Sequence, residues 1–317
     1  MNVLNIVHKP VLLNECLDYL SPVGEIYEKN AFMIDSTLGE GGHSEAFLQK
    51  FETLRILGLD ADPKIQEKAK IRLECFGRRM SFFRGWFNDF YANFSSDSEK
   101  PHLILFDLGI SVFHYEESER GFSFRLDEKL DMRLNPDSII SAEELVNTFK
   151  EKDLADLFFN YSEERYSRRI AKAIVEARKA SKIVSSKVLA DVIYDAVPSQ
   201  YRHGAIHPAT KSFQAIRIAV NSETERIEKA LKDAFLVLEN GGKMGVITFH
   251  SGEDRIVKNY FRDLAKKCIC PPEVAVCQCG GKPRAELLTR KPVLPSAKEV
   301  EENSPSRSAK LRVIRKK

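Results

Sequence analysis

Short apolar runs that end on an acidic residue recur in the first 110 residues of the chain. They cover residues 31–35, 55–60 and 101–107, and they end on Asp35, Asp60 and Asp107. Continuous apolar runs of this length are typical of parallel strands that are buried on both faces. The acids would then meet at the edge where open α/β sheets bind their ligands.

Segments with helical spacing of apolar residues alternate with these runs. Helices are predicted over residues 44–51 and 64–76, and further strands over residues 80–87 and 243–249. This alternation indicates an α/β fold with a mostly parallel sheet. Apolar and basic residues alternate over part of residues 309–317. This pattern predicts a strand with one face that is basic and exposed to solvent.

The alternation stops after residue 110, and the pattern becomes helical. Ser141 and Glu144 have the spacing of a capping box, and apolar residues recur at helical spacing up to residue 198. An all-helical insertion is therefore predicted, and a long helix over residues 213–238 returns the chain to the sheet. Basic residues share a helix face in the insertion, where they are either solvated or bind phosphate. They are Arg165, Arg168, Arg169 and Lys172, followed by Arg178, Lys179, Lys182 and Lys187.

Composition limits the class of protein without indicating an activity. The 317 residues are 43% hydrophobic, and 49 basic against 46 acidic residues give a net charge of +3. This length and composition predict about two globular domains. No charged-then-apolar leader and no run of eighteen apolar residues occurs, so we expect a soluble cytoplasmic protein without a membrane partner.

The six cysteines lack the dense spacing of a secreted disulfide scaffold. Cys268, Cys270, Cys277 and Cys279 form two C-x-C pairs, and four thiolates at such a spacing could chelate zinc. Because zinc knuckles more commonly use C-x-x-C pairs, no metal is predicted.

A glycine-rich turn follows the first strand. Gly39, Gly41 and Gly42 would let the backbone approach a ligand closely, although many such turns only reverse the chain. A dinucleotide site requires a further glycine where Ser44 stands, so that a helix N-terminus reaches the pyrophosphate. S-adenosylmethionine carries no phosphate, so the turn favours a methyl donor.

Two further residues stand where a nucleoside would be held. Asp60, which ends the second strand, has the position of an acid that binds ribose hydroxyl groups. The alternative role of an acid here is to cap the next helix, and Asp62 with Pro63 fits that role better. Phe87, beyond the third strand, would either cover an adenine ring or belong to the core.

Eight short motifs are spread over almost the whole chain. They lie at residues 8–15, 39–44, 107–111, 120–124, 130–133, 207–210, 213–221 and 249–251. Together they resemble the bacterial small-subunit ribosomal RNA cytosine-N-methyltransferases, the RsmH (MraW) family. The resemblance implies a class I S-adenosylmethionine-dependent methyltransferase, Rossmann-like with a helical insertion. It also implies an enzyme that methylates the exocyclic amino nitrogen, N4, of one decoding-centre cytidine in 16S ribosomal RNA, as naked RNA or in the small subunit.

The same resemblance implies how the chain is divided and which residues contact the cofactor. Residues 1–112 and 207–317 would form the methyltransferase domain, and residues 113–206 would recognise RNA. The oligomeric state stays open between a monomer and a dimer. The implied cofactor contacts, from the methionine end to the adenine, are Gly41, Gly42, His43, Asp107, Asp60 and Phe87, with His114 in the place of a cofactor-contacting glutamine.

Methylation of an amino group requires an acceptor for the proton that the nitrogen loses. Asp107 is predicted to be this acceptor, and its alternative role is to bind the methionine ammonium group. His250, at the end of the fifth strand, is a second candidate, with a structural hydrogen bond as the alternative.

Two other classes of protein compete with a methyltransferase. Ser44 and the basic insertion argue against a nicotinamide oxidoreductase. The three strand-end acids and the glycine turn argue against an RNA-binding protein that retains the fold without an activity.

Overall fold

Two compact units make up the chain, and each is described by itself. The computed structural model describes residues 9–22, 31–204, 206–267 and 281–317, together with residues 270, 273–274, 276 and 278. The first unit consists of residues up to Ile110 and from Glu225 onward, and the second of Ser111–Thr224. The predicted insertion, residues 113–206, falls within the second unit.

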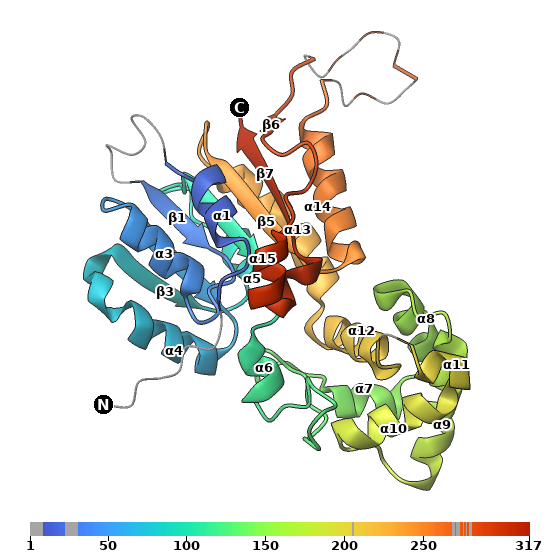
Figure 1. Ribbon diagram of the computed structural model, residues 1–317. Coiled ribbons are helices and arrows are strands. Elements are labelled where there is room, and N and C mark those ends of the chain that lie inside the picture. The colour runs from blue at the N-terminus through green and yellow to red at the C-terminus, as the bar shows by residue number, and fades with distance from the viewer. Residues whose placement is uncertain are drawn as a thin grey trace. The chain divides into compact units, whose positions relative to one another are not determined.

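A single sheet organises the first unit. Its strands are β1 (Phe32–Asp35), β2 (Arg55–Asp60), β3 (Met80–Arg84), β4 (Leu103–Asp107), β5 (Lys243–Thr248), β6 (Ala285–Leu287) and β7 (Lys310–Lys316). Within the described residues they form a seven-stranded sheet in the order β3-β2-β1-β4-β5-β7-β6 (Figure 1). The pairs among β1 to β5 are parallel, whereas β7 is antiparallel to β5 and to β6. The predicted fold class, α/β with a mostly parallel Rossmann-like sheet, is confirmed.

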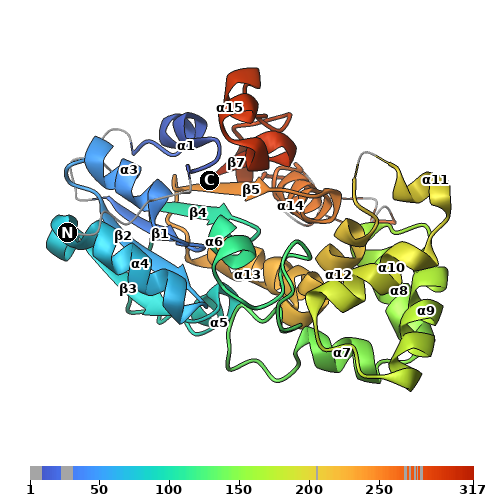
Figure 2. The same ribbon diagram turned by 60° about the horizontal axis from the view of Figure 1, so that its bottom comes forward.

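The strands are buried on both faces, which explains their continuous apolar runs. In β1, Met33 packs into the core on one face and Ile34 into the core on the other, and Leu105 and Phe106 do the same in β4. Figure 2 shows the sheet with α3 on one side and α13 on the other. Helices α1 (Leu13–Tyr19), α3 (Gly42–Lys50) and α4 (Pro63–Leu73) contribute to the first core, and α5 (Phe87–Ala92), α13 (Glu223–Val237) and α14 (Ser251–Leu264) to the second.

The C-terminal strand does not have the predicted wet face. Because β7 lies between β5 and β6, its central residues are buried. Arg312 is only 8% exposed, and its guanidinium donates to the two carboxylate oxygens of Asp254 at 2.8 and 3.2 Å. The charge in this strand therefore belongs to an internal ion pair. Short elements near the sheet are the 3₁₀ helices η1 (Glu74–Arg79) and η2 (Ser304–Ser308) and helix α15 (Ala297–Glu302).

The second unit is helical, as predicted for the insertion. Its helices are α6 (Val112–Glu116), α7 (Ala142–Thr148), α8 (Glu151–Ser162), α9 (Ser167–Ala180), α10 (Ser186–Ala196), α11 (Ser199–Arg202) and α12 (Ala209–Asn221). Ser141 caps α7 by accepting the backbone N–H of Glu144 at 3.2 Å. Among the described residues, no helix is both long enough and apolar enough to cross a membrane.

The prediction of one long helix over residues 213–238 is wrong, because α12 and α13 are separate helices. Ser222 has a φ of 49°, and its N–H bonds to the carbonyl oxygens of Ile218 and Ala219. This left-handed residue ends α12, and α13 starts at the next position. The apolar spacing continues across the break, which is why the pattern alone does not reveal it.

Candidate active site

Two carboxylates lie near each other at the carboxyl ends of the adjacent strands β1 and β4. Asp35 is 1% exposed, and its Oδ2 accepts the hydroxyl of Ser44 at 2.7 Å. Burial raises the pKa of Asp35 to about 6, although hydrogen bonds from Ser44 and Thr37 oppose the shift. The carboxylate that ends β1 therefore orients the start of α3.

Asp107 is the second of these carboxylates, and its surroundings differ. Its backbone N–H donates to Thr37 Oγ1 at 2.6 Å, which ties β4 to the turn after β1. Its Oδ1 is buried and has no hydrogen-bond partner among the described residues. Burial raises the pKa of Asp107 well above its ordinary value, and the charges of Asp35 and Glu253 raise it further. A buried oxygen without a donor is the feature expected where a ligand supplies one.

His43 lies next to Asp107, in the first turn of α3. Its Nε2 is 3.0 Å from the carbonyl oxygen of Val11, and its Nδ1 is 3.5 Å from Asp107 Oδ2. A carbonyl oxygen only accepts hydrogen bonds, so Nε2 carries a hydrogen and Nδ1 of the neutral ring does not. Together, His43 and Asp107 can hold one proton at a buried position.

Asp60 connects the glycine turn to β2. Its Oδ2 accepts the N–H of Gly39 at 2.9 Å, and its Oδ1 accepts the N–H of Asp62 at 2.8 Å. These two hydrogen bonds orient the carboxylate at the turn. Asp62 itself caps α4 through the N–H of Lys64 at 2.9 Å, as predicted.

Gly41 and Gly42 are required by packing within the protein. Gly41 has a φ of +80°, and a Cβ there would lie 2.8 Å from Leu73 Cδ1. A Cβ at Gly42 would lie 2.6 Å from Pro10 Cγ. At Gly39, with a φ of +55°, a Cβ would meet no described atom within 4 Å. Neighbouring side chains thus explain two of the glycines, and the open side of the turn is at Gly39.

His250 and Phe87 make structural contacts within the same unit. His250 caps α14: its Nδ1 accepts the N–H of Glu253 at 3.4 Å, and its Nε2 is 3.0 Å from Glu253 Oε1. The ring of Phe87 meets that of Phe106 edge-on, with centroids 5.7 Å apart. A catalytic role for His250 and an adenine contact for Phe87 stay predictions.

The predicted site residues are divided between the units. The first unit contains Gly41, Gly42, His43, Asp60, Phe87, Asp107 and His250, whereas His114 belongs to the second. His114 lies in α6 with 4% exposure, and its ring meets the rings of Phe113 and Phe122 at 5.5 and 5.3 Å.

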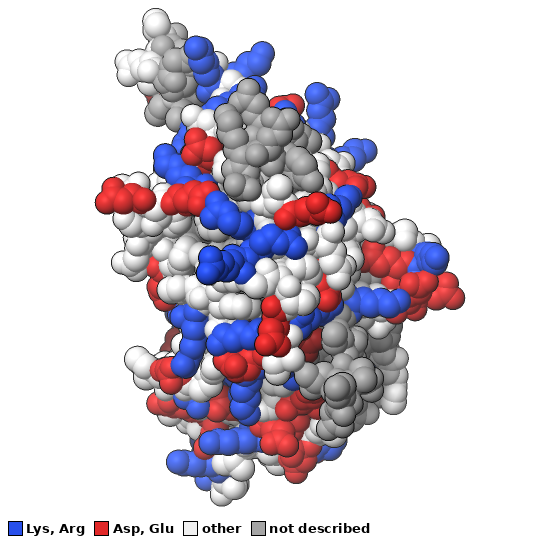
Figure 3. All heavy atoms as spheres, turned by 90° about the vertical axis from the view of Figure 1, so that its left-hand side faces the viewer, with Lys and Arg blue, Asp and Glu red and all other residues white. Residues whose placement is uncertain are grey.

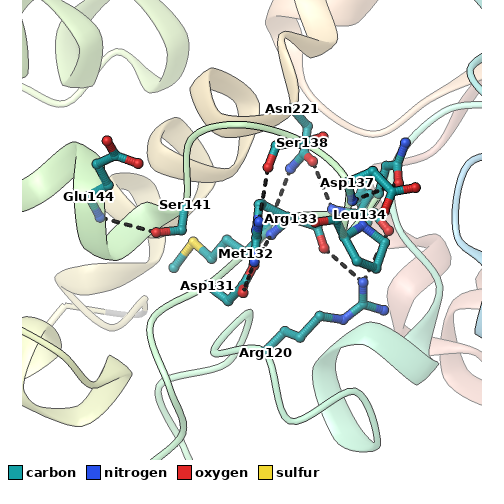
Figure 4. Close-up of polar contacts among 12 residues, drawn as sticks. Arg120, Asp131, Met132, Arg133, Leu134, Asp137, Ser138, Ser141, Glu144 and Asn221 are labelled. Carbon is teal, nitrogen blue, oxygen red and sulfur yellow. Dashed lines mark hydrogen bonds and ion pairs between the residues drawn. The ribbon is translucent and has the colours of Figure 1, made fainter.

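A tightly hydrogen-bonded loop in the second unit, residues 120–138, contains two of the motifs that carry the resemblance, residues 120–124 and 130–133, although no individual site residue is predicted in it (Figure 4). Met132 at its centre is fully buried with a φ of 56°, a conformation that persists only when its surroundings impose it. Asn221 makes two hydrogen bonds to this loop. Its side chain donates to the carbonyl of Met132 and accepts the N–H of Leu134, each at 2.8 Å. Arg120 donates to the carbonyls of Arg133 and Leu134 at 2.8 and 3.0 Å.

The side chain of Arg133 forms hydrogen bonds to other residues of the same loop. Its guanidinium donates to both carboxylate oxygens of Asp131 at 2.8 Å and to the carbonyls of Pro136 and Ser138. Burial opposes ionisation of Asp131, but the hydrogen bonds and charge of Arg133 outweigh it and lower the pKa of Asp131. The guanidinium of Arg133 is therefore committed to holding the loop.

The basic residues around α9 divide into bonded and exposed ones. Arg178 donates to the carbonyl of Val146 at 2.7 Å, and Lys179 forms an ion pair with Glu176 at 2.8 Å. Arg168 and Arg169 are exposed, and no carboxylate within the described chain pairs with either. Arg168 and Arg169 therefore belong to the exposed part of the basic face, together with Lys172 and Lys182.

The metal prediction concerns residues that are mostly outside the described part of the chain. Cys268, Cys277 and Cys279 lie outside it, and Cys270 is a free thiol. The described residues include no group of three His, Cys, Asp or Glu side chains arranged to hold a metal ion.

Asp35→Asn should make the protein less sensitive to pH. A carboxyl group with a pKa of about 6 in the folded state and of 3.8 in the unfolded chain binds more protons when the protein is folded. Stability then falls as pH rises from 4 to 6, by about 3 kcal/mol in total. Relative to the parent, the Asn variant should gain about this amount between pH 4 and 7, with Asp107 contributing because the two carboxylates titrate together. Urea unfolding at several pH values measures it, and a pH-independent difference would contradict the assignment.

Comparison with known proteins shows similarity along the whole chain. Residues 5–317 match the model of a family described as the MraW methylase family. The ribosomal RNA small subunit methyltransferase H of Treponema denticola is 57% identical over 98% of this chain and 97% of its own. The protein of the same description from Treponema pallidum is 42% identical over 98% of this chain and 93% of its own. Among solved structures, an rRNA methylase from Streptococcus thermophilus aligns with 98% of each chain at 10% identity, with a TM-score of 0.42.

Proposed function

Because the chain belongs to the MraW methylase family, we propose that it transfers a methyl group from S-adenosylmethionine to small-subunit ribosomal RNA. The observation that carries this proposal is the match of almost the full chain to ribosomal RNA small subunit methyltransferases. The resemblance found in the sequence is thereby confirmed at the level of the family. We further propose that the acceptor is the N4 amino group of one cytidine in 16S ribosomal RNA, and that the enzyme acts in the cytoplasm.

The residues at the carboxyl edge of the sheet fit S-adenosylmethionine. The cofactor has an ammonium group, a sulfonium and two ribose hydroxyls, all of which favour acidic acceptors nearby. Asp107 offers a buried oxygen without a donor, and Asp60 is oriented at the glycine turn. Gly41, Gly42 and His43 would line the methionine end, and Phe87 would border the adenine. The hydroxyl of Ser44, at the position where a dinucleotide site requires glycine, donates to Asp35.

We propose that Asp107 accepts the proton that the cytosine nitrogen loses. When bound, S-adenosylmethionine supplies a methyl group on a sulfonium, which the cytosine nitrogen can attack directly. The nitrogen must lose a proton as the new bond forms, and Asp107 Oδ1 would accept it. His43 Nδ1, 3.5 Å from Oδ2, can then share this proton. His250 is the second candidate: its Nδ1 accepts the N–H of Glu253, whereas its Nε2, 3.0 Å from Glu253 Oε1, has no hydrogen-bond partner among the described residues.

Transfer of an isotope-labelled methyl group tests the proposed function. The protein, labelled S-adenosylmethionine and 16S ribosomal RNA from cells that lack the protein are combined, once with naked RNA and once with assembled small subunits. Mass spectrometry of nuclease fragments should find the label on the N4 of a single cytidine. Absence of label from both substrates, or label on another base, would refute the proposal.

His43→Ala should weaken binding of S-adenosylmethionine about fivefold, equivalent to ~1 kcal/mol. The imidazole would line the methionine end and lies 3.5 Å from Asp107 Oδ2, so its loss leaves that carboxylate less well oriented. Titration calorimetry without RNA measures the affinity. His102→Ala is the control, because its ring bonds to the N–H of Phe32 at the other end of the sheet. Equal affinities of the His43 variant and the parent would count against the contact.

A further inference from the structure

The N-terminal segment, residues 9–12, lies between the glycine turn and the C-terminal segment, residues 296–303. Pro10 packs on Gly42, where a Cβ would come within 2.6 Å of it. Asn303 Nδ2 donates to the carbonyl of Lys9 at 3.0 Å. Glu299 Oε1 accepts the N–H of Leu12 at 2.7 Å. Residues almost 300 positions apart in the chain are thus joined by hydrogen bonds.

Leu12 has a backbone conformation that depends on these contacts. Its φ of 53° and ψ of 36° are left-handed, which a leucine adopts only when its surroundings require it. Its side chain is fully buried, and the carboxylate of Glu299 satisfies its N–H. The hydrogen bond to Glu299 is charge-assisted and therefore among the stronger bonds available to a backbone amide.

A single peptide unit connects Glu299 to the candidate active site. The N–H of Leu12 and the carbonyl of Val11 belong to the same planar peptide, so a bond that orients one orients the other. The N–H is bonded to Glu299, and the carbonyl accepts Nε2–H of His43 at 3.0 Å. His43 Nδ1 in turn faces Asp107 Oδ2 at 3.5 Å. The carboxylate of Glu299 also polarises the peptide, which makes the Val11 carbonyl a better acceptor.

We propose that Glu299 is a positioning residue for methyl transfer, acting through the peptide between Val11 and Leu12. By holding that peptide, it keeps the hydrogen of His43 on Nε2 and leaves Nδ1 directed at Asp107 as a proton acceptor. The inference rests on the proposed function for its effect on turnover. Its effect on the tautomer of His43 does not depend on that function.

The test compares variants of the full-length protein in two measurements. Glu299→Ala removes the acceptor, Glu299→Gln keeps a carbonyl oxygen that can accept the Leu12 N–H, and Glu301→Ala is the control on the same helix, at an exposed position. The first measurement is the ¹⁵N–¹H signal of His43 Nε2–H in protein with labelled histidine and no cofactor, identified by its loss in His43→Gln. The second is the turnover number for methylation of small subunits.

Glu299→Ala should lose the protected Nε2–H signal, and its turnover number should fall about tenfold. Glu299→Gln and Glu301→Ala should keep the signal and the turnover number of the parent. Retention of the signal in Glu299→Ala would overturn the proposal, as would equal losses in the alanine and glutamine variants. If Glu299→Ala does not fold, Glu299→Asp, which keeps the charge on a shorter side chain, takes its place with the same expected losses. If the parent transfers no methyl group, the proposed function fails, and the spectrum alone still decides whether Glu299 sets the tautomer.

Discussion

Asp107→Asn is expected to lower the turnover number for methyl transfer by about 10²–10³-fold, the contribution typical of a general base. Asparagine has nearly the same shape, and the backbone bond to Thr37 Oγ1 is independent of the side chain. What the variant lacks is a group that can take the proton from the cytosine nitrogen. Single-turnover transfer to small subunits at saturating S-adenosylmethionine measures the loss.

The same variant distinguishes the two roles considered for Asp107. If the carboxylate only binds the methionine ammonium, affinity for the cofactor falls and a saturating concentration restores turnover. Turnover within threefold of the parent under those conditions would therefore contradict the acceptor role. As a base, Asp107 acts in its ionised form, so turnover of the parent should rise with pH through the raised pKa of this group.

Asp107→Asn should also be more stable than the parent at neutral pH. The folded state raises the pKa of Asp107, so folding favours the protonated form and loses stability as pH rises through that pKa. Removal of the charge removes this loss. Urea unfolding at pH 7 checks the direction, and a less stable variant would argue against the burial of this charge. Together, lower activity and higher stability are the combination expected of a group retained for chemistry.

Reversal of the exposed pair, Arg168→Glu with Arg169→Glu, is expected to weaken binding to 16S ribosomal RNA about 100-fold at low salt. If both guanidinium groups contact phosphates, their loss should also reduce the slope of log affinity against log salt by about 1.5–2. Neither residue pairs with a carboxylate of the described chain, so the change should cost little folding stability. Filter binding at several salt concentrations measures both quantities.

The matched control reverses two lysines of the first unit, Lys64 and Lys70 on α4. It changes the net charge by the same amount and lies on exposed surface, and it differs from the test pair in that Lys70 forms an ion pair with Glu67 at 2.6 Å. Figure 3, which looks at the molecule from the left-hand side of Figure 1, shows basic and acidic side chains interspersed on that face. The control should therefore bind RNA nearly as the parent does. An equal loss in both double variants would mean that total charge, and not the face of α9, determines binding.

The strands of the sheet and their terminal acids could be predicted because burial on both faces leaves a direct trace in the sequence. Predicted bounds agree with β2 throughout and with β1 and β4 within a few residues, since apolar runs and acids mark where each strand ends. The cap formed by Asp62 was also predictable, because it depends on adjacent residues alone. The class of cofactor followed from Ser44, whose hydroxyl bonds to Asp35.

Features that depend on contacts distant in sequence could not be predicted. The break at Ser222 leaves the apolar spacing intact, and Arg312 appeared solvated because its partner, Asp254, is 58 residues away. The reasons for Gly41 and Gly42 lie in Leu73 and Pro10. Glu299 gave no signal at all, because a single acid on a short helix looks like any other surface residue until the fold brings it to Leu12.

The position of β7 has a consequence for the order of events during synthesis. This strand lies between β5 and β6, so β6 has no partner in the sheet until residues 310–316 have been made. Helix α15, whose Glu299 accepts the N–H of Leu12, likewise precedes β7 by only a few residues. A nascent chain can build the parallel half of the sheet early, as domains generally fold from the N-terminal side. The peptide that positions His43 therefore lacks its bond to Glu299 until residue 299 has been made, long after β1 and β4.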